Sequence, residues 1–539
     1  MAPEIGKGLV VVMALGTFVV VLDNTIMNVS ISALVADLQT TVSGVQAAIA
    51  LNALMMAAFV LMGGKMADIL GMKKTFLTGS LIYIAGSLLA SLSNNLSVFI
   101  LGWCAIQGFG AAMMLPNVNT IIRAYITGLE RVKAYGVMGG INALAMAVGP
   151  IIGGFLTTYF SWRWAFRLEV VVLIGVLLMS RAIPKDVMGK ARPVLDKVGV
   201  MWQATAMVLF VLGTLLIADY GLIFAKQPLM IGDYAFAPLG LSIVPFLWGA
   251  AVLCLIQFVH HERHLEEKGR DRLIDLGLFG IRDFVQGLNV RFIQVALIAG
   301  MLFTVPLFLQ VTYGISAFET GFILFGLTAG LLPTAMGGAK RGQHILPRRK
   351  VGWGFFTAVL GVLIMVGYMH VGHDPLGLVP GLFVFGLGMG LVVSQIVNLI
   401  MSAVTPGQTA EASGIASTLE TLGSSVGTAV IGTILVVALT SGVVNMVDHS
   451  TVFPCQLKEK IGQNMVTSLE VVSTDVVSEN IPGNTAYEAE AIRIYDTARQ
   501  NAFIITLMFM AFAAFAGYLL ARRLPAVKTV PEAEAEAEA

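Results

Sequence analysis

Charged residues are scarce in this sequence. Asp, Glu, Lys and Arg make up 12% of the 539 residues, whereas hydrophobic residues make up 57%. An ordinary soluble domain carries about 25% charged residues, so the composition excludes one. Instead, fourteen apolar stretches each reach about 20 residues, the length that crosses a bilayer core. Because backbone polar groups in lipid must be bonded internally, these stretches are predicted to be helices of an all-α membrane protein.

Cysteines and nucleotide-binding motifs are equally sparse. Of the three cysteines, only Cys455 falls outside the predicted spans, which excludes a disulfide framework. The chain has no G-x-x-x-x-G-K-[ST] sequence, so ATP hydrolysis is not indicated. The seven histidines do not follow a metal-binding spacing, and His260, His261 and His264 are expected to be solvated. We expect no metal, no cofactor, no nucleic-acid partner and no enzymatic activity.

The distribution of basic residues predicts the orientation. The first apolar stretch is too long for a signal-peptide core and is predicted to stay as a span. When Lys and Arg are assigned to alternate loops, 26 of the 33 fall on the side that holds both termini. The positive-inside rule therefore places both termini in the cytoplasm of a multi-pass protein in the plasma (inner) membrane.

The spacing of the fourteen stretches predicts two similar halves, the usual architecture of transporters that bind their substrate between the halves near the midplane. Both halves have a loop that opens with Gly-Gly and ends in a basic cluster, at 63–76 and 337–350. A short helical hairpin is expected within the external loop. The predicted units are a six-helix bundle (1–190), two inserted helices with a linker (191–265), a second six-helix bundle (266–525) with the external loop 441–498, and an acidic tail (526–539).

Acidic residues inside the predicted spans mark candidate sites, because a carboxylate there costs about 2.5–3.5 kcal/mol on insertion scales. Asp23 and Glu420 are each expected to face the interior, either as structural acids or as substrate- or proton-binding groups. Glu169 is either the partner of an arginine or a cavity acid. Arg167 is a further candidate for substrate or proton coupling; it is two residues away, about 200° around the helix, so it cannot pair with Glu169 within the helix. Further polar residues predicted to line the cavity are Asn24, Asn28, Asn52, Gln107, Asn117 and Gln310.

Two glycine-containing segments are candidates for a conformational switch. The first is "GKMADILGMKK" and the second is "GPIIGG", where Pro150 removes a backbone hydrogen bond and bends the helix. Each allows a simpler interpretation, as a plain turn and as ordinary helix packing. The candidate switch residues are Gly64, Asp68, Gly71, Lys73, Lys74, Gly149, Pro150, Gly153 and Gly154.

Several ordered motifs together resemble one family. "GKMADILGMKK" resembles the first-loop signature of the major facilitator superfamily, and "GPIIGG" the fifth-helix signature of its drug:proton antiporters. "LDNTIMNVSI" is similar to the first-helix signature of the fourteen-span branch (EmrB/QacA type), and "WRWAF" also matches that branch. One departure is Cys104 in "CAIQG", where the family usually carries an arginine.

The resemblance implies alternating access, with two bundles rocking about a central cavity and helices seven and eight inserted between them. It implies that Asp68 docks on the start of the thirteenth helix, where Thr409 and Ser413 are candidate caps. The expected function is proton-driven export of a small amphipathic, possibly cationic compound, as in multidrug efflux. The expected partners are the lipid bilayer, protons and that compound, and the protein is expected to be a monomer.

Three alternatives stay open at this point. One is proton-coupled uptake by symport, and another is export of one specific metabolite. The third is a membrane sensor that binds a ligand without transporting it.

Overall fold

The computed structural model describes residues 3–126, 128–184, 194–231, 234–337, 345–371, 374–405, 408–454, 458 and 485–525. The expected external hairpin and the acidic tail lie outside these residues. Within them, twelve helices are long and apolar enough to cross a membrane. The chain is therefore a multi-pass, overwhelmingly helical membrane protein, as the composition predicts.

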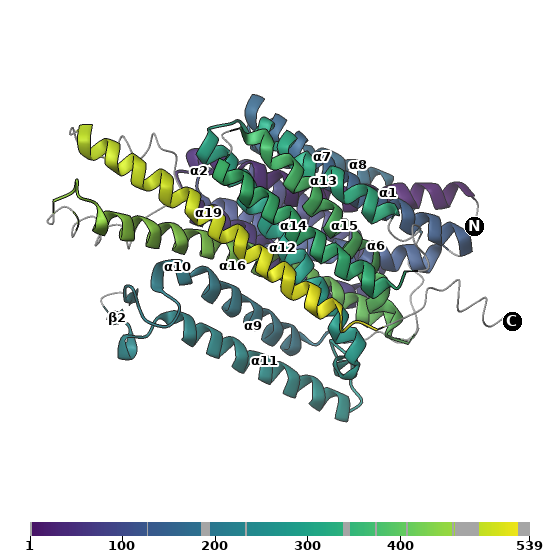
Figure 1. Cartoon of the computed structure of the whole chain (residues 1–539). Helices are drawn as coiled ribbons and strands as arrows, with labels where there is room; N and C mark the ends of the chain where they lie inside the picture. The colour runs from purple at the N-terminus through teal and green to yellow at the C-terminus, as the bar shows by residue number, and fades with distance from the viewer. Residues whose placement is uncertain are drawn as a thin grey trace.

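Long helices run side by side along one axis (Figure 1). The first six of the predicted stretches correspond to α1 (Pro3–Val29), α3 (Val42–Leu70), α4 (Met72–Ser91), the continuous segment α5 (Leu96–Phe99), η1 (Ile100–Gln107) and α6 (Gly108–Tyr125), α7 (Gly128–Tyr159) and α8 (Arg163–Leu178). The next two are α9 (Lys197–Leu215) and α11 (Ile243–Glu267). The last six are α12 (Arg282–Tyr313), α13 (Ala317–Gly337), α14 (Pro347–Val371), α15 (Val379–Ser402), α16 (Thr409–His449) and α19 (Thr485–Ala521).

Short elements complete the chain. They are α2 (Ile31–Asp37), η2 (Met179–Ala182), α10 (Ile217–Tyr220), η3 (Pro238–Gly240), η4 (Leu276–Gly280), η5 (Pro375–Leu378) and the antiparallel hairpin of β1 (Leu229–Ile231) and β2 (Tyr234–Phe236). The first turn of α1 and the last turn of α19 lie at the same end of the bundle, here called the basic end, whereas α2 and β2 lie at the opposite end (Figure 1).

Two expected loop boundaries were wrong. Helices α16 and α19 extend well into the expected external loop 441–498, ending at His449 and beginning at Thr485. The expected first loop is also mostly helical, since α3 continues to Leu70 and α4 begins at Met72. Gly71 alone separates them, with φ +101°, a backbone conformation that favours glycine.

The two halves meet along two helix pairs, α3 with α16 and α7 with α13. Glycines bring the second pair together: a Cβ atom on Gly154 would overlap the Ala317 backbone, and one on Gly321 would overlap the Pro150 backbone. On the other face of α7, Gly149 and Gly153 pack in the same way against α1. Small residues thus let the backbones approach closely, as in other membrane bundles.

Helices α9 and α11 lie along one side of the bundle (Figure 1). Helix α9 contacts α3 from the first half and α16 from the second, while α11 packs mainly on α9. A small apolar core forms where α9 meets this seam, around Leu54, Val211 and Ala429. The inserted pair thus covers the seam from outside through α9.

Candidate functional site

Asp23, the acid in the first apolar stretch, is buried inside the first half. Its side chain accepts hydrogen bonds from Trp103 Nε1, at 3.1 Å to Oδ1 and 3.0 Å to Oδ2. Trp103 itself is held by Asn52, whose Nδ2 donates to the Trp103 carbonyl oxygen at 3.0 Å. Asp23 is therefore turned toward protein rather than lipid.

Glu169 lies beside Asp23 and is fully buried. Its Oε2 accepts hydrogen bonds from Ser87 Oγ at 3.1 Å and from Gln107 Nε2 at 3.3 Å. The two carboxyl groups are electrostatic neighbours, and the Tyr83 hydroxyl and Glu169 Oε1 are buried without a hydrogen-bond partner among the described residues. We call Asp23 and Glu169 the carboxyl pair.

The elements around the carboxyl pair explain how these residues meet. Helix α4 packs against both η1 and α8, and α1 packs against α8. Tyr83 and Ser87 are four residues apart on α4, as are Trp103 and Gln107 on η1, so each two share one face of their helix. The η1 segment is a π-helix, a wider winding that recurs at functional sites.

The carboxyl pair has neutral hydrogen-bond partners. Within the described part of the chain, these are the Trp103 indole, the Ser87 hydroxyl and the Gln107 amide, and no basic group bonds to it. Cys104, at the position where the family usually has arginine, donates from Sγ to the Ala48 carbonyl oxygen at 3.1 Å. A carboxylate only accepts hydrogen bonds, so a bond between the two carboxyl groups needs a proton on one of them. The arrangement can therefore bind and release a proton.

An aromatic cluster separates the carboxyl pair from the end opposite the basic end. The Phe99 ring lies 5.1 Å from the Trp103 ring and 5.4 Å from the Trp162 ring, measured between centroids. Trp162 Nε1 donates to Asp37 Oδ2 at 2.8 Å, and Arg163 also pairs with Asp37. This cluster ties α2 to α8.

Glu420 does not join the carboxyl pair. It lies on α16 in the second half, where Oε1 is 2.7 Å from Arg291 NH2 of α12. Arg291 is nearly buried and also donates to Gln294 Oε1 at 2.6 Å, whereas 48% of the Glu420 side chain is exposed. The expected orientation toward protein agrees with this contact, because Gly423 and Gly427 on the same side of α16 also pack on α12.

The remaining predicted polar residues are dispersed. Asn24 and Asn28 each bond to backbone one turn earlier on α1, and Asn117 bonds to Met113 and Gly63 oxygens. Gln310 Nε2 donates to the Val29 carbonyl oxygen at 2.8 Å and so links the halves. Arg167 stacks over the Trp164 ring, away from Glu169.

The candidate switch residues do not form one cluster either. Asp68 is exposed, with Lys65 as a charged neighbour, and α16 has Gln408 as its N-cap residue instead of Thr409 or Ser413. Docking of Asp68 on that helix stays a prediction. Lys73 Nζ donates to the Ile183 carbonyl oxygen at 2.7 Å. A Cβ atom on Gly64 would meet Pro116 only at ordinary contact distance.

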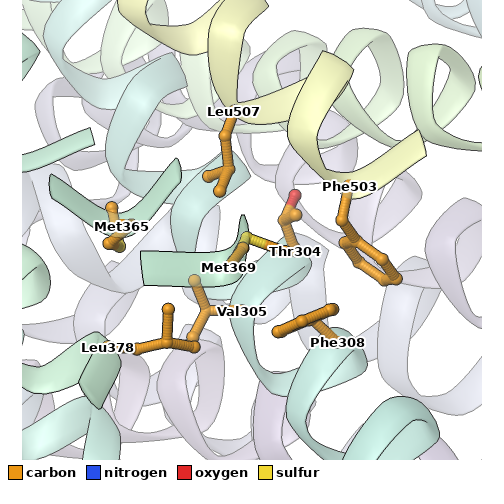
Figure 2. A pocket seen from close by; sticks show the side chains of 8 residues that line it. All are labelled: Thr304, Val305, Phe308, Met365, Met369, Leu378, Phe503 and Leu507. Atoms are coloured by element: carbon orange, nitrogen blue, oxygen red, sulfur yellow. The ribbon is translucent and has the colours of Figure 1, made fainter. Parts of the chain in front are cut away.

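A small pocket lies elsewhere, in the second half (Figure 2). Its lining comes from α12, α14, α19 and η5, and Thr304 is the polar residue among its apolar neighbours. The pocket shares α12 with the pair of Arg291 and Glu420, but its α12 residues lie about three turns or more further along that helix. We assign it no role in the chemistry of either acid site.

Comparison with known proteins identifies the family to which this architecture belongs. A sequence model of the Major Facilitator Superfamily matches residues 13–428. The chain belongs to that superfamily, and it is a transporter and not an enzyme. The resemblance seen in the motifs is confirmed.

Relatives and solved structures agree with this membership. A probable actinorhodin transporter of Streptomyces coelicolor is 30% identical over 77% of this chain and 69% of its own length. A multidrug transporter of Bacillus subtilis is 24% identical over 94% and 91%, and a puromycin resistance protein of Streptomyces alboniger is 27% identical over 82% and 84%. A peptide transporter structure shares the fold, with a TM-score of 0.61 at 15% identity over 98% of each chain.

Proposed function

We propose that this protein is a proton-coupled exporter of small amphipathic organic compounds, of the fourteen-span drug:proton antiporter type. The carboxyl pair carries the proposal, because two buried acids without a basic partner hold a proton until the site opens. The names of the relatives, which include multidrug and antibiotic resistance proteins, support export and an antibiotic-like substrate class.

The proposed cycle uses the residues in named roles. Asp23 and Glu169 bind one proton from outside, and opening toward the basic end exposes them to a less acidic solution, where the proton leaves. Glu420, held by Arg291, supplies a fixed charge that orients the substrate. Both termini face the cytoplasm, and the protein works as a monomer in the plasma membrane.

Two further features belong to the proposal, the number of spans and the helices that move. Besides the twelve helices that meet the length and apolarity of a span, α4 and α8 complete the fourteen. Helix α7 moves against α13, with Pro150 at the bend and Gly154 and Gly321 keeping the backbones close. Asp68 is proposed to dock on α16 in the state that closes the basic end.

Everted membrane vesicles with an imposed pH gradient test coupling directly. Puromycin, or a lipophilic cationic dye, should dissipate the gradient in vesicles that contain the protein. Asp23→Asn and Glu169→Gln should each abolish this response, and Glu420→Gln should weaken substrate binding. Glu319→Gln is the matched control, since Glu319 is exposed at the start of α13. Full coupling in both Asp23→Asn and Glu169→Gln would refute the proposal.

A further inference from the structure

A second buried carboxylate lies at the basic end, where α11 meets the segment that leads to α12. Glu262, near the end of α11, is fully buried. Its Oε2 accepts hydrogen bonds from the backbone N–H groups of Leu273 and Ile274, at 3.0 and 3.1 Å. Glu262 therefore fastens this segment, which we call the linker (268–281), to α11.

Asp196, the residue before α9, brings a second carboxyl group to the same place. Its Oδ1 is 2.9 Å from His261 Nε2, so His261 is not solvated in the way the sequence suggests. Its Oδ2 and the Oε1 of Glu262 are both buried, and neither has a hydrogen-bond partner among the residues that the structure describes. A Cβ atom on Gly199 would overlap both oxygens, so the two face one small space that glycine keeps open.

Two carboxylates that face one small buried space disfavour each other's charged form. An unpaired buried oxygen costs about 1–3 kcal/mol, and more when it is charged. One proton between the carboxyl groups would satisfy both oxygens at once. We propose that Asp196 and Glu262 share a proton at the base of α9 and α11, and that losing it drives the two carboxylates apart and so opens the contact between the start of α9, α11 and the linker.

The other charged groups nearby engage other partners. Arg272 of the linker pairs with Glu266 and with Asp275, the latter at 3.0 Å, and Glu411 of α16 lies near it. Asp271 accepts a hydrogen bond from the Val194 backbone, and Lys197 is exposed. His261 is the basic group that faces Asp196 directly.

The linker connects this proton to the transport helices. Asp275 caps η4 by accepting from the Gly277 N–H at 2.9 Å, and its other oxygen accepts from Gln408 Nε2 at 3.4 Å. Gln408 is the N-cap residue of α16, the helix that carries Glu420 and packs on α3. Release of the linker would loosen the basic end of α16, which makes the shared proton a regulator of transport by pH on that side.

Hydrogen exchange of the linker tests the shared proton without any transport assay. The full chain in nanodiscs is labelled from about pH 5 to about pH 9, and rates are corrected for the intrinsic pH dependence with an unstructured linker peptide. We expect the corrected rate at 268–281 to rise about tenfold or more across one midpoint toward alkaline pH. A corrected rate that stays constant would overturn the proposal.

Substitutions and a salt control sharpen the test. Glu262→Gln and Asp196→Asn place an amide donor in the shared space, so each should keep the linker protected at every pH. Gly199→Ala should expose it at every pH, whereas Gly249→Ala on α11, with open space at its Cβ position, should match the unmodified protein. If Glu262→Gln titrates like the unmodified protein, or if the midpoint moves when sodium replaces choline, the shared proton is refuted. Because no flux is measured, this result is independent of the proposed export.

Discussion

Asp23 and Glu169 in the first half are both buried and are electrostatic neighbours, whereas Glu420 in the second half is half exposed and paired with Arg291. The two halves therefore neutralise their acids by different means. Without a basic partner, a buried acid loses its charge by taking up a proton. Glu420 instead has a guanidinium nitrogen of Arg291 at 2.7 Å from its Oε1, which is a charge-assisted contact.

This difference separates two tasks that an antiporter needs. A group that gains and loses a proton can couple transport to a gradient, but a permanently charged pair cannot. A permanent pair can still select and orient a substrate from its exposed side. We therefore expect coupling to depend on the first half and substrate recognition on the second.

Supplying the missing cation to the first half should have the largest effect. Cys104→Arg would place a guanidinium next to η1, near Asp23, and make the first half resemble the second. The carboxyl pair would then stay charged, and proton-coupled flux should fall more than about tenfold, as measured by gradient dissipation in everted vesicles. Cys104→Met, which enlarges the side chain without adding charge, controls for crowding. Retained coupling in the arginine variant, with normal elution on size exclusion, would contradict this account.

Replacing either partner of the pair in the second half should destabilise the protein, but by different amounts. Glu420→Gln leaves the nearly buried Arg291 charge without its partner, at a cost of about 2–3 kcal/mol. Arg291→Gln leaves Glu420 exposed to its surroundings, at a cost below about 1 kcal/mol. Thermal unfolding in detergent measures both. Equal losses of unfolding free energy in the two variants would mean that side-chain exposure does not determine the cost of removing a partner.

Removing one donor from the first half should shift coupling without abolishing it. Trp103→Phe keeps the ring contacts with Phe99 but removes the N–H that donates to both Asp23 oxygens. The carboxylate form loses about 1.4 kcal/mol of stabilisation, so the proton is released at a pH about one unit higher. The pH profile of transport should move toward alkaline pH by that amount. Trp164→Phe, at an exposed ring on α8, should leave the profile in place.

The sequence predicted most of the fold because spans depend on local hydrophobicity. Helices α4 and α8 fall outside the twelve clear spans for visible reasons. Helix α4 begins with two lysines and carries several polar residues, and α8 has only 16 residues. The loop limits were wrong because α16 and α19 continue as polar helices beyond their apolar part, where hydrophobicity no longer marks a boundary.

The candidate site was less predictable because it depends on which helices meet. Asp23, Glu169 and Gln107 were identified as unusual polar residues in apolar stretches, but their contact depends on how α1, α8 and η1 pack. Trp103 gave no signal, since an indole is ordinary in a membrane helix. Arg291 did give one, as an isolated arginine in a long apolar stretch, and should have suggested a partner for Glu420.

The contact between the halves offers the smallest change that still tests the comparison. Gln310 Nε2 donates to the Val29 carbonyl oxygen, just beyond the polar part of α1 that holds Asp23. Gln310→Leu removes about 1 kcal/mol from the contact between the halves at this end, which shifts a two-state equilibrium about fivefold toward their separation there. Spin labels on α2 and η5 should report a larger population at long distance, while the pH profile of coupling keeps its midpoint. A moved midpoint would mean that the contact between the halves and the carboxyl pair are not independent. Opening at this end would then by itself change how tightly the proton is held.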